Sequence, residues 1–456
     1  MKFDSKVQKM KYQTLKEVIK AAYNNKLGSL LAFGNRSEAE IERIWGAVGG
    51  LSPDAGIIHF CPSACHACGE SGFKVTNACR GCSARHCEVA CKFGAINRDE
   101  NGRAVIDKEK CVNCGLCAKS CRYHAIINEQ KPCKRACEVG AIKSTEDGKI
   151  VIDESKCISC GACIYECPFG AIVDVSMITS VVGLLKNSGG ERIYAMIAPS
   201  IAGQFGKASV GQIATALKKL GFTDVIETAL GADMVSIAEA QELYDKGFLL
   251  SSCCPAFVDY VKKFFPEFEE DISTHLSPMG TLGCEIKMKD KDAKIVFIGP
   301  CTAKKMEIKK PEVKRYIDYA ITFEELLALF DVNEINLESL EEEKIEHASY
   351  FGRRYAKNCG LSDAIKQSLS EQRLRFDVKP VMGNGIASCK TALLKAKAGR
   401  PDGNFIEGMA CVGGCMGGAC MISKTKNQSY DKKYFDDSAH KKITDAVLEN
   451  LNGKKI

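Results

Sequence analysis

The chain of 456 residues lacks the features that would place it in a membrane, on a nucleic acid or with a nicotinamide cofactor. No run of 18 apolar residues occurs, and the best candidate, near residues 178–185, is too short to span a bilayer. Residues 1–6 carry no apolar signal region, so we expect a cytoplasmic protein with no membrane partner. No stripe of basic residues with interleaved aromatics indicates nucleic-acid binding, and no Rossmann or flavin fingerprint indicates direct use of NAD.

Composition and charge are otherwise ordinary. Hydrophobic residues make up 45% of the chain and charged residues 26%, and the length suits two or three domains. The formal net charge of +6 is small for this length. It favours a solvated basic surface over a docking site for an acidic redox partner, although both fit the charge.

Cysteine is the outlier, with 26 residues. In a secreted chain this number would indicate disulfides. Without a signal region, and with short spacings between the cysteines, metal binding is the better interpretation. Seventeen cysteines lie between residues 61 and 167, and nine lie between residues 253 and 420.

The front third contains two motifs typical of bacterial ferredoxins. They are Cys111-x2-Cys114-x2-Cys117-x3-Cys121 and Cys157-x2-Cys160-x2-Cys163-x3-Cys167. In this pattern three close cysteines wrap one [4Fe–4S] cubane, and the fourth usually binds the neighbouring cluster. We therefore expect an α+β, ferredoxin-like iron–sulfur region over residues 56–175.

This region is internally repeated with an offset of 46 residues. Six cysteines of the first copy recur in the second, and residues 104–107 match residues 150–153, which we predict to be strands of β-hairpins that frame the cluster loops. The repeated cysteines are Cys87, Cys91, Cys111, Cys114, Cys117 and Cys121, followed by Cys133, Cys137, Cys157, Cys160, Cys163 and Cys167.

The number of front clusters depends on a third cysteine group. Cys79 and Cys82 precede Cys87 and Cys91 in a variant of the same motif, so residues 79–167 hold 14 cysteines. Three cubanes need 12 and four need 16. We predict three front clusters, and a fourth would have to recruit Cys61, Cys65 or Cys68. One of His59, His66 and His86 could bind iron, although a surface position is the more frequent role for such a histidine.

Residues 1–55 contain no cysteine and show helical apolar spacing over residues 15–23 and 38–45. We interpret them as a helical cover over the first cluster. A helical segment that packs only on itself fits the pattern equally well.

Three short cysteine signatures dominate the second half, at residues 251–255, 299–305 and 407–415. The first two follow strand-like runs and lead into helix-like sequence. Ligands of α/β sheets bind beyond the carboxyl ends of the strands, so the loops can converge on one point. Adjacent Cys253 and Cys254 cannot easily bind the same cubane, which leaves one of the two for another task.

These three signatures, in this order, resemble those of the [FeFe]-hydrogenases. The likeness extends from about residue 190 to residue 420 and implies an α/β, two-lobed catalytic domain over residues 190–425, followed by a helical tail over residues 426–456. A buried strand at 192–198 and a helix at 212–221, ended by a glycine, fit that class.

The resemblance implies that Cys254, Cys301, Cys411 and Cys415 hold the cubane of an H-cluster. Cys415 would also bridge to a two-iron subsite that carries CO, cyanide and an azadithiolate.

The resemblance also gives roles to side chains around the cluster. Cys253 matches the thiol that carries protons to the subsite. Glu242, Ser273 and Glu239 would continue the path outward in that order, although the i, i+3 spacing of the two glutamates alone favours a solvated helix face.

The remaining implied roles concern the ligands of the two-iron subsite. Lys304 and Ser200 match residues that bind cyanide, since a buried ammonium needs an anionic partner. Met409 matches a methionine that packs against the two-iron subsite.

The chain departs from the best-known members of this family at several positions. Gly299 stands where Met is usual, Phe257 where Trp is usual, and Met279 where Gln is usual; residues 416–420 also differ. Such neighbours tune potential and rate, so a divergent subgroup is indicated. Cys284, Cys359, Cys389 and Cys420 have no assigned role and are expected to be buried small hydrophobes.

We therefore expect reversible hydrogen activation, with ferredoxin or a similar carrier as electron partner and with dedicated maturation proteins. One alternative is a non-catalytic iron–sulfur assembly factor, which keeps the four cubane cysteines. Cys253, Lys304, Met409 and the two glutamates argue against it because a plain cubane needs none of them. A slow, hydrogen-sensing hydrogenase is the other alternative.

Overall fold

The structure is a computed structural model, and it describes residues 3–31, 36–49, 56–65, 68–69, 71–145, 147–423, 433–436 and 442–452. His66 lies outside these residues. Within them, no helix combines the length and the apolar character needed to cross a membrane.

The N-terminal helices belong to the hydrophobic core of the large C-terminal region. They are α1 (Lys6–Tyr23), α2 (Leu27–Leu31) and α3 (Glu38–Val48). Leu15, Val18 and Ile19 of α1 are buried in one core with α8 (Ile178–Lys186) and α14 (Phe323–Val332). Helix α1 is therefore not packed only on itself. Helix α3 lies on the cysteine loop at Pro62–Ala64, as the predicted cover requires.

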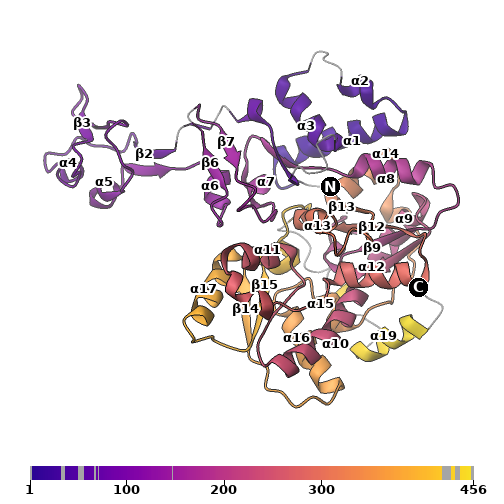
Figure 1. Cartoon of the computed structure of the whole chain (residues 1–456). Helices are drawn as coiled ribbons and strands as arrows, with labels where there is room; N and C mark the ends of the chain where they lie inside the picture. Colours follow the sequence, from indigo (N-terminus) through magenta and orange to yellow (C-terminus); the bar gives the residue numbers. More distant parts are fainter. Residues whose placement is uncertain are drawn as a thin grey trace.

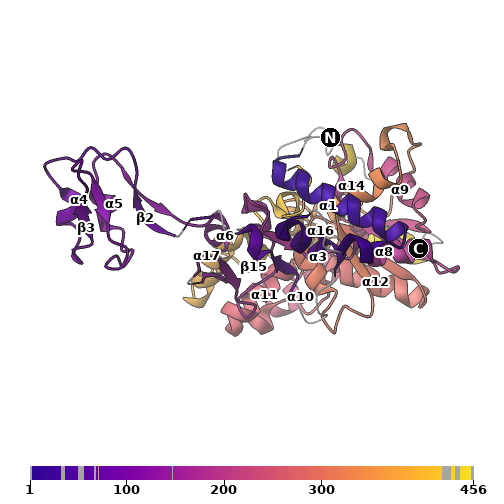
Figure 2. The same cartoon turned by 90° about the horizontal axis from the view of Figure 1, so that it is seen from above.

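The front region consists of two similar ferredoxin-like units (Figure 1). The first contains β2 (Gly72–Val75), α4 (His86–Val89), β3 (Ile96–Arg98), β4 (Ala104–Ile106), α5 (Leu116–Ser120) and β5 (Ile126–Glu129). The second contains β1 (Ile58–Phe60), α6 (Pro132–Ala136), β6 (Ile142–Ser144), β7 (Ile150–Ile152), α7 (Ala162–Glu166) and β8 (Ile172–Asp174). The predicted hairpins are confirmed as β3–β4 and β6–β7. Figure 2 shows the first unit standing away from the rest of the molecule.

The large region is built on two parallel sheets. The four-stranded sheet has the order β10-β9-β12-β13, and the three-stranded sheet has the order β11-β15-β14. The strands are β9 (Ile193–Ile197), β10 (Asp224–Glu227), β11 (Leu249–Leu250), β12 (Lys294–Gly299), β13 (Tyr319–Thr322), β14 (Pro380–Asn384) and β15 (Phe405–Met409). The strand predicted at 192–198 is confirmed as β9, whose five residues are all buried.

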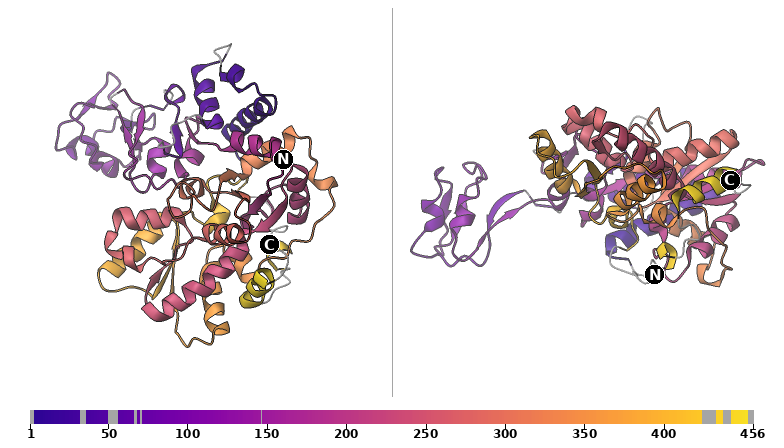
Figure 3. Two further views of the ribbon diagram at one scale, coloured as in Figure 1. Left: turned by 45° about the vertical axis from the view of Figure 1, so that its right-hand side comes forward. Right: turned by 90° about the horizontal axis from the view of Figure 1, so that it is seen from below.

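Helices cover both sheets (Figure 3). They are α9 (Val210–Lys219), α10 (Thr228–Lys246), α11 (Pro255–Phe264), α12 (Pro278–Lys289), α13 (Thr302–Glu307), α15 (Tyr350–Arg354), α16 (Gly360–Glu371), α17 (Ile386–Lys397) and α19 (Ile443–Asn452). Helix α9 begins two residues before its predicted start because Ser209 and Gln212 form a capping box. Gly221 follows its end with a positive φ of 107°, which a glycine adopts without strain.

Candidate functional site

The three cysteine signatures meet at the carboxyl ends of strands from both sheets. Cys253 and Cys254 follow β11, Cys301 follows β12, and Cys411 follows β15. Cys253, Cys254, Cys301 and Cys415 line one almost entirely apolar cavity. The convergence inferred from the strand-like runs is thus present in the folded chain.

The four thiols of the implied cubane set lie close together and are partly buried. Burial is the main cause that raises the pKa of Cys301 to about 12 and of Cys415 to about 11, and the charge of Cys254 adds to both shifts. Burial, Cys301 and Cys254 likewise raise the pKa of Cys411. Thiols with such high pKa values give up their protons readily only when a metal cation binds the thiolate. The donor set therefore fits an iron–sulfur cluster.

Among the described residues, no three His, Cys, Asp or Glu side chains are grouped tightly enough for a single metal ion. A cubane differs from a single ion because each of its thiolates binds a different iron.

Cys253 lies deeper than its neighbour Cys254 and has a different set of contacts. Burial, Cys254 and Glu239 raise its pKa well above the ordinary value. The Lys304 ammonium is 3.4 Å from its carbonyl oxygen. Cys253 therefore has a carboxyl group near its thiol, while Cys254 is close enough to the other three thiols of the set to raise their pKa values.

The two glutamates of α10 have different environments. Glu239 is fully buried, and its Oε1 accepts hydrogen bonds from the Ser252 backbone N–H at 3.1 Å and hydroxyl at 3.0 Å. Its Oε2 has no hydrogen-bond partner among the described residues. Burial raises the pKa of Glu239 to about 7. The spacing predicts that Glu239 lies on a solvated helix face, and this prediction is wrong.

Glu242 lies one turn further along α10, near the surface. Partial burial opposes its ionisation, but Lys246 at 2.8 Å and the Thr274 backbone N–H outweigh it and lower its pKa. The Ser273 hydroxyl stabilises the charged forms of both Glu239 and Glu242. Cys253, Glu239, Ser273 and Glu242 therefore follow one another in space in this order, which differs from the order expected from the sequence.

Lys304 already has an anionic partner in the protein. Its ammonium pairs with Glu307 at 2.7 Å and donates to the Ser277 hydroxyl at 2.7 Å. Burial alone would lower the pKa of Lys304, but Glu307 outweighs it and raises that pKa. The anionic partner that a buried ammonium needs is thus already present within the chain, and the i, i+3 spacing of Lys304 and Glu307 was a usable signal for it.

Several uncharged side chains complete the cavity wall. Ser200 is fully buried, and its hydroxyl has no hydrogen-bond partner among the described residues, so it is available to a bound group. Met409 and Met279 also line the cavity. Gly299 is explained by packing, because a Cβ there would lie 2.6 Å from the ring of Phe297, which itself lines the cavity.

Tyr355 is a cavity residue that the sequence reading missed. Its hydroxyl is 3.0 Å from that of Ser236, which donates to the Ala232 carbonyl at 2.7 Å. Burial and the nearby Glu239 raise the pKa of Tyr355 well above its ordinary value. No motif marks this tyrosine, since it lies about 100 residues from Cys253 in the chain.

The second ferredoxin unit approaches the thiols of the cavity. Burial raises the pKa values of Cys157, Cys160 and Cys163, and the nearby Cys137 thiol adds to each of these shifts. The charge of Cys160 contributes to the raised pKa of Cys411, and the charge of Cys254 contributes to the raised pKa of Cys160. The Thr302 hydroxyl, next to Cys301, donates to the Ser159 carbonyl at 2.6 Å. The two thiol sets therefore face each other across a packed contact.

The repeated cysteines of the two units also make matching backbone contacts. Backbone N–H groups donate to Cys91 at 3.3 Å, Cys121 at 3.4 Å, Cys137 at 3.2 Å and Cys167 at 3.3 Å. In the first unit, Cys87 is close to Cys121, and Cys117 is close to Cys111 and Cys114. These contacts show that the two units hold their repeated thiols in the same way.

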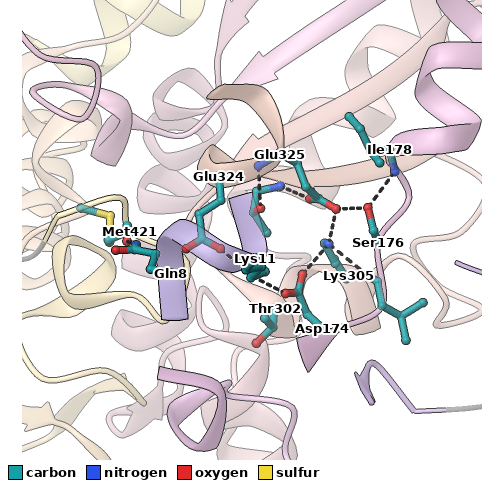
Figure 4. A network of polar contacts seen from close by, with 12 residues as sticks. Gln8, Lys11, Asp174, Ser176, Ile178, Thr302, Lys305, Glu324, Glu325 and Met421 are labelled. Atoms are coloured by element: carbon teal, nitrogen blue, oxygen red, sulfur yellow. Dashed lines mark hydrogen bonds and ion pairs between the residues drawn. The ribbon is translucent and has the colours of Figure 1, made fainter. Parts of the chain in front are cut away.

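A buried ion network joins the second unit to the large region (Figure 4). Asp174, at the end of β8, pairs with Lys11 of α1 at 2.7 Å and with Lys305 of α13 at 2.7 Å. Lys305 also pairs with Glu325 at 2.9 Å, and Lys11 with Glu324 at 2.5 Å. Burial would raise the pKa of Asp174, but the two ammonium groups outweigh it and hold that pKa well below its ordinary value. The network fixes the ferredoxin unit beside the loop that carries Cys301.

Comparison with known families agrees with this geometry. Residues 191–419 match the family described as "Iron only hydrogenase large subunit, C-terminal domain". The chain belongs to the iron-only hydrogenase family. Residues 104–127 and 150–173 match the 4Fe-4S binding domain, so the chain is a hydrogenase-type protein with iron–sulfur, electron-transfer modules.

Two hydrogenases illustrate the relationship. The periplasmic [Fe] hydrogenase large subunit of Nitratidesulfovibrio vulgaris is 31% identical over 373 residues, which cover 69% of this chain and 85% of that protein. Iron hydrogenase 1 of Clostridium pasteurianum is 28% identical over 290 residues, 51% of this chain. The match spans only 50% of that relative's length.

Two further comparisons bear on fold and on function. A variant of the [FeFe]-hydrogenase HydA1 from Chlamydomonas reinhardtii superposes with a TM-score of 0.51 at 19% identity, covering 60% of this chain and 94% of that one. This likeness shows a shared fold. The cytosolic Fe-S cluster assembly factor NAR1 of Candida dubliniensis is 35% identical over 109 residues, 21% of this chain and 19% of that protein.

Proposed function

We propose that this iron-only hydrogenase family member catalyses the reaction 2H⁺ + 2e⁻ ⇌ H₂ at a six-iron H-cluster. Cys254, Cys301, Cys411 and Cys415 would hold the cubane, and Cys415 would also bridge to the two-iron subsite. The subsite supplies the chemistry of making and splitting H₂ when it is bound. The free hydroxyl of buried Ser200 and the ammonium of Lys304 suit its cyanide ligands, and Met409 would pack against it.

The observation that carries this proposal is the path of acidic groups that leads away from Cys253. Glu239 is buried with a pKa of about 7, so it is poised to take and release a proton near neutrality. Ser273 and Glu242 continue the path to the surface, where Lys246 and His275 contact Glu242. A protein that only stores or delivers a cubane has no use for such a path.

Infrared spectroscopy tests the proposal directly. Protein matured anaerobically with the hydrogenase maturation proteins should show intrinsic CO and CN stretches and should evolve H₂ from a reduced carrier. Protein made without maturation should contain cubanes alone and should have no hydrogenase activity. If matured protein lacks the bands, the assembly-factor function becomes the better one.

The assembly-factor function remains the second candidate because of the NAR1 similarity. Complementation of a strain that lacks its own assembly factor distinguishes the two. Rescue by this chain, with no CO or CN bands after maturation, would establish the alternative. A hydrogen-sensing enzyme would show the bands but turn over slowly.

The electron path and its partner follow from the thiol sets. We propose that electrons pass from a ferredoxin-type carrier to the first unit, then to the set at Cys137, Cys157, Cys160 and Cys163, and on to the cavity. The two sheets would form two lobes on either side of the H-cluster, within the limits 190–425 expected from the sequence. A cytoplasmic location is proposed because none of the 26 cysteines is in a disulfide and their short spacings suit metal binding; cell fractionation checks it.

A further inference from the structure

The second ferredoxin unit is interrupted by the first. Strand β1 pairs with β8, with Phe60 opposite Ile172, although about 110 residues separate them. The whole first unit lies between these strands and is closed by its own pair, β2 with β5, where Gly72 is opposite Glu129. Both ends of residues 71–129 therefore leave the second unit at the same place. The 46-residue repeat reflects one unit inserted into a loop of another, not two units in tandem.

The two units can be compared position by position. In the first, the Thr76 backbone N–H donates to the Ala125 carbonyl at 2.8 Å. In the second, the Cys61 backbone N–H donates to the Ala171 carbonyl, also at 2.8 Å, and Ala171 lies 46 residues after Ala125. Cys61 thus occupies the position of Thr76, which has no thiol.

The next cysteines correspond in the same way. In the first unit, the Ala104 backbone N–H donates to the Cys79 sulfur at 3.5 Å. In the second, the backbone of Ile150, 46 residues after Ala104, hydrogen-bonds Cys65. Cys65 is therefore the counterpart of Cys79. Since Cys68 follows Cys65 at the spacing at which Cys82 follows Cys79, Cys68 is the counterpart of Cys82.

We propose that Cys65, Cys68, Cys133 and Cys167 bind a fourth front [4Fe–4S] cluster, and that Cys61 is not a ligand. This set is the counterpart of Cys79, Cys82, Cys87 and Cys121. It takes two ligands from before the inserted unit and two from after it, so the site exists only in the folded chain.

The surroundings of the proposed site support a bound cluster. Cys65, Cys133 and Cys167 are buried in one hydrophobic cluster. Lys131 is buried beside them, and its ammonium donates to the Cys68 carbonyl at 2.9 Å. The charge of Lys131 favours the thiolate forms of Cys65 and Cys68, because it lowers the pKa values that burial raises.

With this site, four front clusters use 16 of the 17 cysteines that precede residue 170. The three-cluster count leaves two of the cysteines in residues 79–167 without a role. The insertion also makes the first unit the outer end of the electron path. None of this depends on hydrogen activation, so the inference can fail while the proposed function holds, and the reverse.

Iron and sulfide analysis of the full chain tests the inference. The protein is produced without maturation, reconstituted anaerobically and assayed for bound iron and sulfide. We expect about 20 irons for each unaltered chain, from five cubanes. The double variant Cys65→Ser, Cys68→Ser should lose about four irons and four sulfides. The matched double variant Cys79→Ser, Cys82→Ser should lose the same amount, and Cys61→Ser should lose none.

Unchanged iron in the Cys65, Cys68 double variant would overturn the fourth cluster. A loss in Cys61→Ser equal to that of the double variant would overturn the position-by-position correspondence. Because the double variant could also fail to fold, the single variant Cys65→Ser provides a second readout. It keeps an oxygen ligand and should change the electron paramagnetic resonance spectrum of the reduced protein, whereas Cys61→Ser should leave that spectrum unaltered. Equal spectra for these two single variants would refute the assignment.

Discussion

The front region and the large C-terminal region hold their reactive side chains in different ways. In the front region, thiols come in short motifs that recur at a constant offset of 46 residues, and backbone N–H groups donate to them at matching positions. In the large region, the cavity gathers side chains that lie more than 150 residues apart, from Ser200 to Cys415. Local spacing therefore marks most of the thiols of the front region, whereas packing of distant segments alone defines the cavity.

The same difference applies to the proposed paths of electrons and of protons. Electrons would follow a row of repeated thiol sets, each of which is complete within one unit. Protons would follow Cys253, Glu239, Ser273 and Glu242, which come from the β11 loop, helix α10 and the loop after α11. A substitution on the proton path should therefore spare the metal sites, and a substitution of a ligand should not.

The largest expected effect comes from the adjacent cysteines. Cys253→Ser should keep the metal site but lose about 10²–10⁴-fold in turnover, because a hydroxyl has a far higher pKa than a thiol and relays protons poorly. Cys254→Ser should instead lose the cubane. Hydrogen-evolution assays and infrared spectra of the two variants check this pair. Near-full activity of Cys253→Ser with an intact infrared spectrum would show that protons take another route.

The next effect tests the joint between the two regions. Asp174→Asn removes the anion between Lys11 and Lys305 and leaves buried charges uncompensated, so we expect a loss of about 3–5 kcal/mol in the free energy of unfolding. The control is Asp153→Asn, which removes a solvent-screened pair with Lys143 at 3.0 Å and should lower the free energy of unfolding far less. Anaerobic denaturant titrations compare the two, and equal losses would show that the joint contributes little.

A pH dependence follows from Glu239. Its folded pKa of about 7 lies above its ordinary value of 4.5, so the folded state holds the proton more tightly than the unfolded state. Stability should therefore fall as the pH rises from about 4.5 through 7, by on the order of 3 kcal/mol for this group. Glu239→Gln should flatten that part of the profile, while Glu242→Gln should not. Both variants should slow turnover with nearly unchanged infrared bands.

Thermal denaturation between pH 5 and pH 8 measures this profile. If Glu239→Gln follows the unaltered protein at every pH, the carboxyl does not hold a proton in the folded state, and the order of the relay must be revised.

The smallest effect is expected at Tyr355. Tyr355→Phe removes a hydroxyl that contacts Ser236 but no ligand, so we expect a loss of about 1 kcal/mol in stability. Because Glu239 lies nearby, the pH profile of turnover should shift slightly while the infrared bands stay in place. A large loss of activity with altered bands would place this hydroxyl against the subsite itself.

Most of the local structure could be predicted from the sequence. The strand at 192–198, the helices near the N-terminus and the hairpins before each cluster loop are confirmed, since each rests on apolar periodicity or turn chemistry within a short segment. The family resemblance is also confirmed. The start of α9 was misplaced because the capping role of Ser209 was not recognised.

The candidate site was less accessible to the same reasoning. The spacing of Glu239 and Glu242 shows that they share a helix face, but it contains no information on which of them is deep. The partner of Lys304 was overlooked although Glu307 is one turn away. Tyr355 could not be found at all, because nothing near it in the chain marks a cavity residue.

The amino-acid sequence by itself determined the thiol motifs, their repeat and the family to which the chain belongs, because a cluster needs ligands at spacings that one short loop can supply. Only the tertiary structure decided that Glu239 is buried while Glu242 is near the surface, and that Lys304 is balanced by Glu307. It also decided that Cys65 and Cys68 lie beside Cys133 and Cys167 across an inserted unit. Burial and contacts between distant segments depend on how the whole chain packs, so no local sequence pattern predicts them.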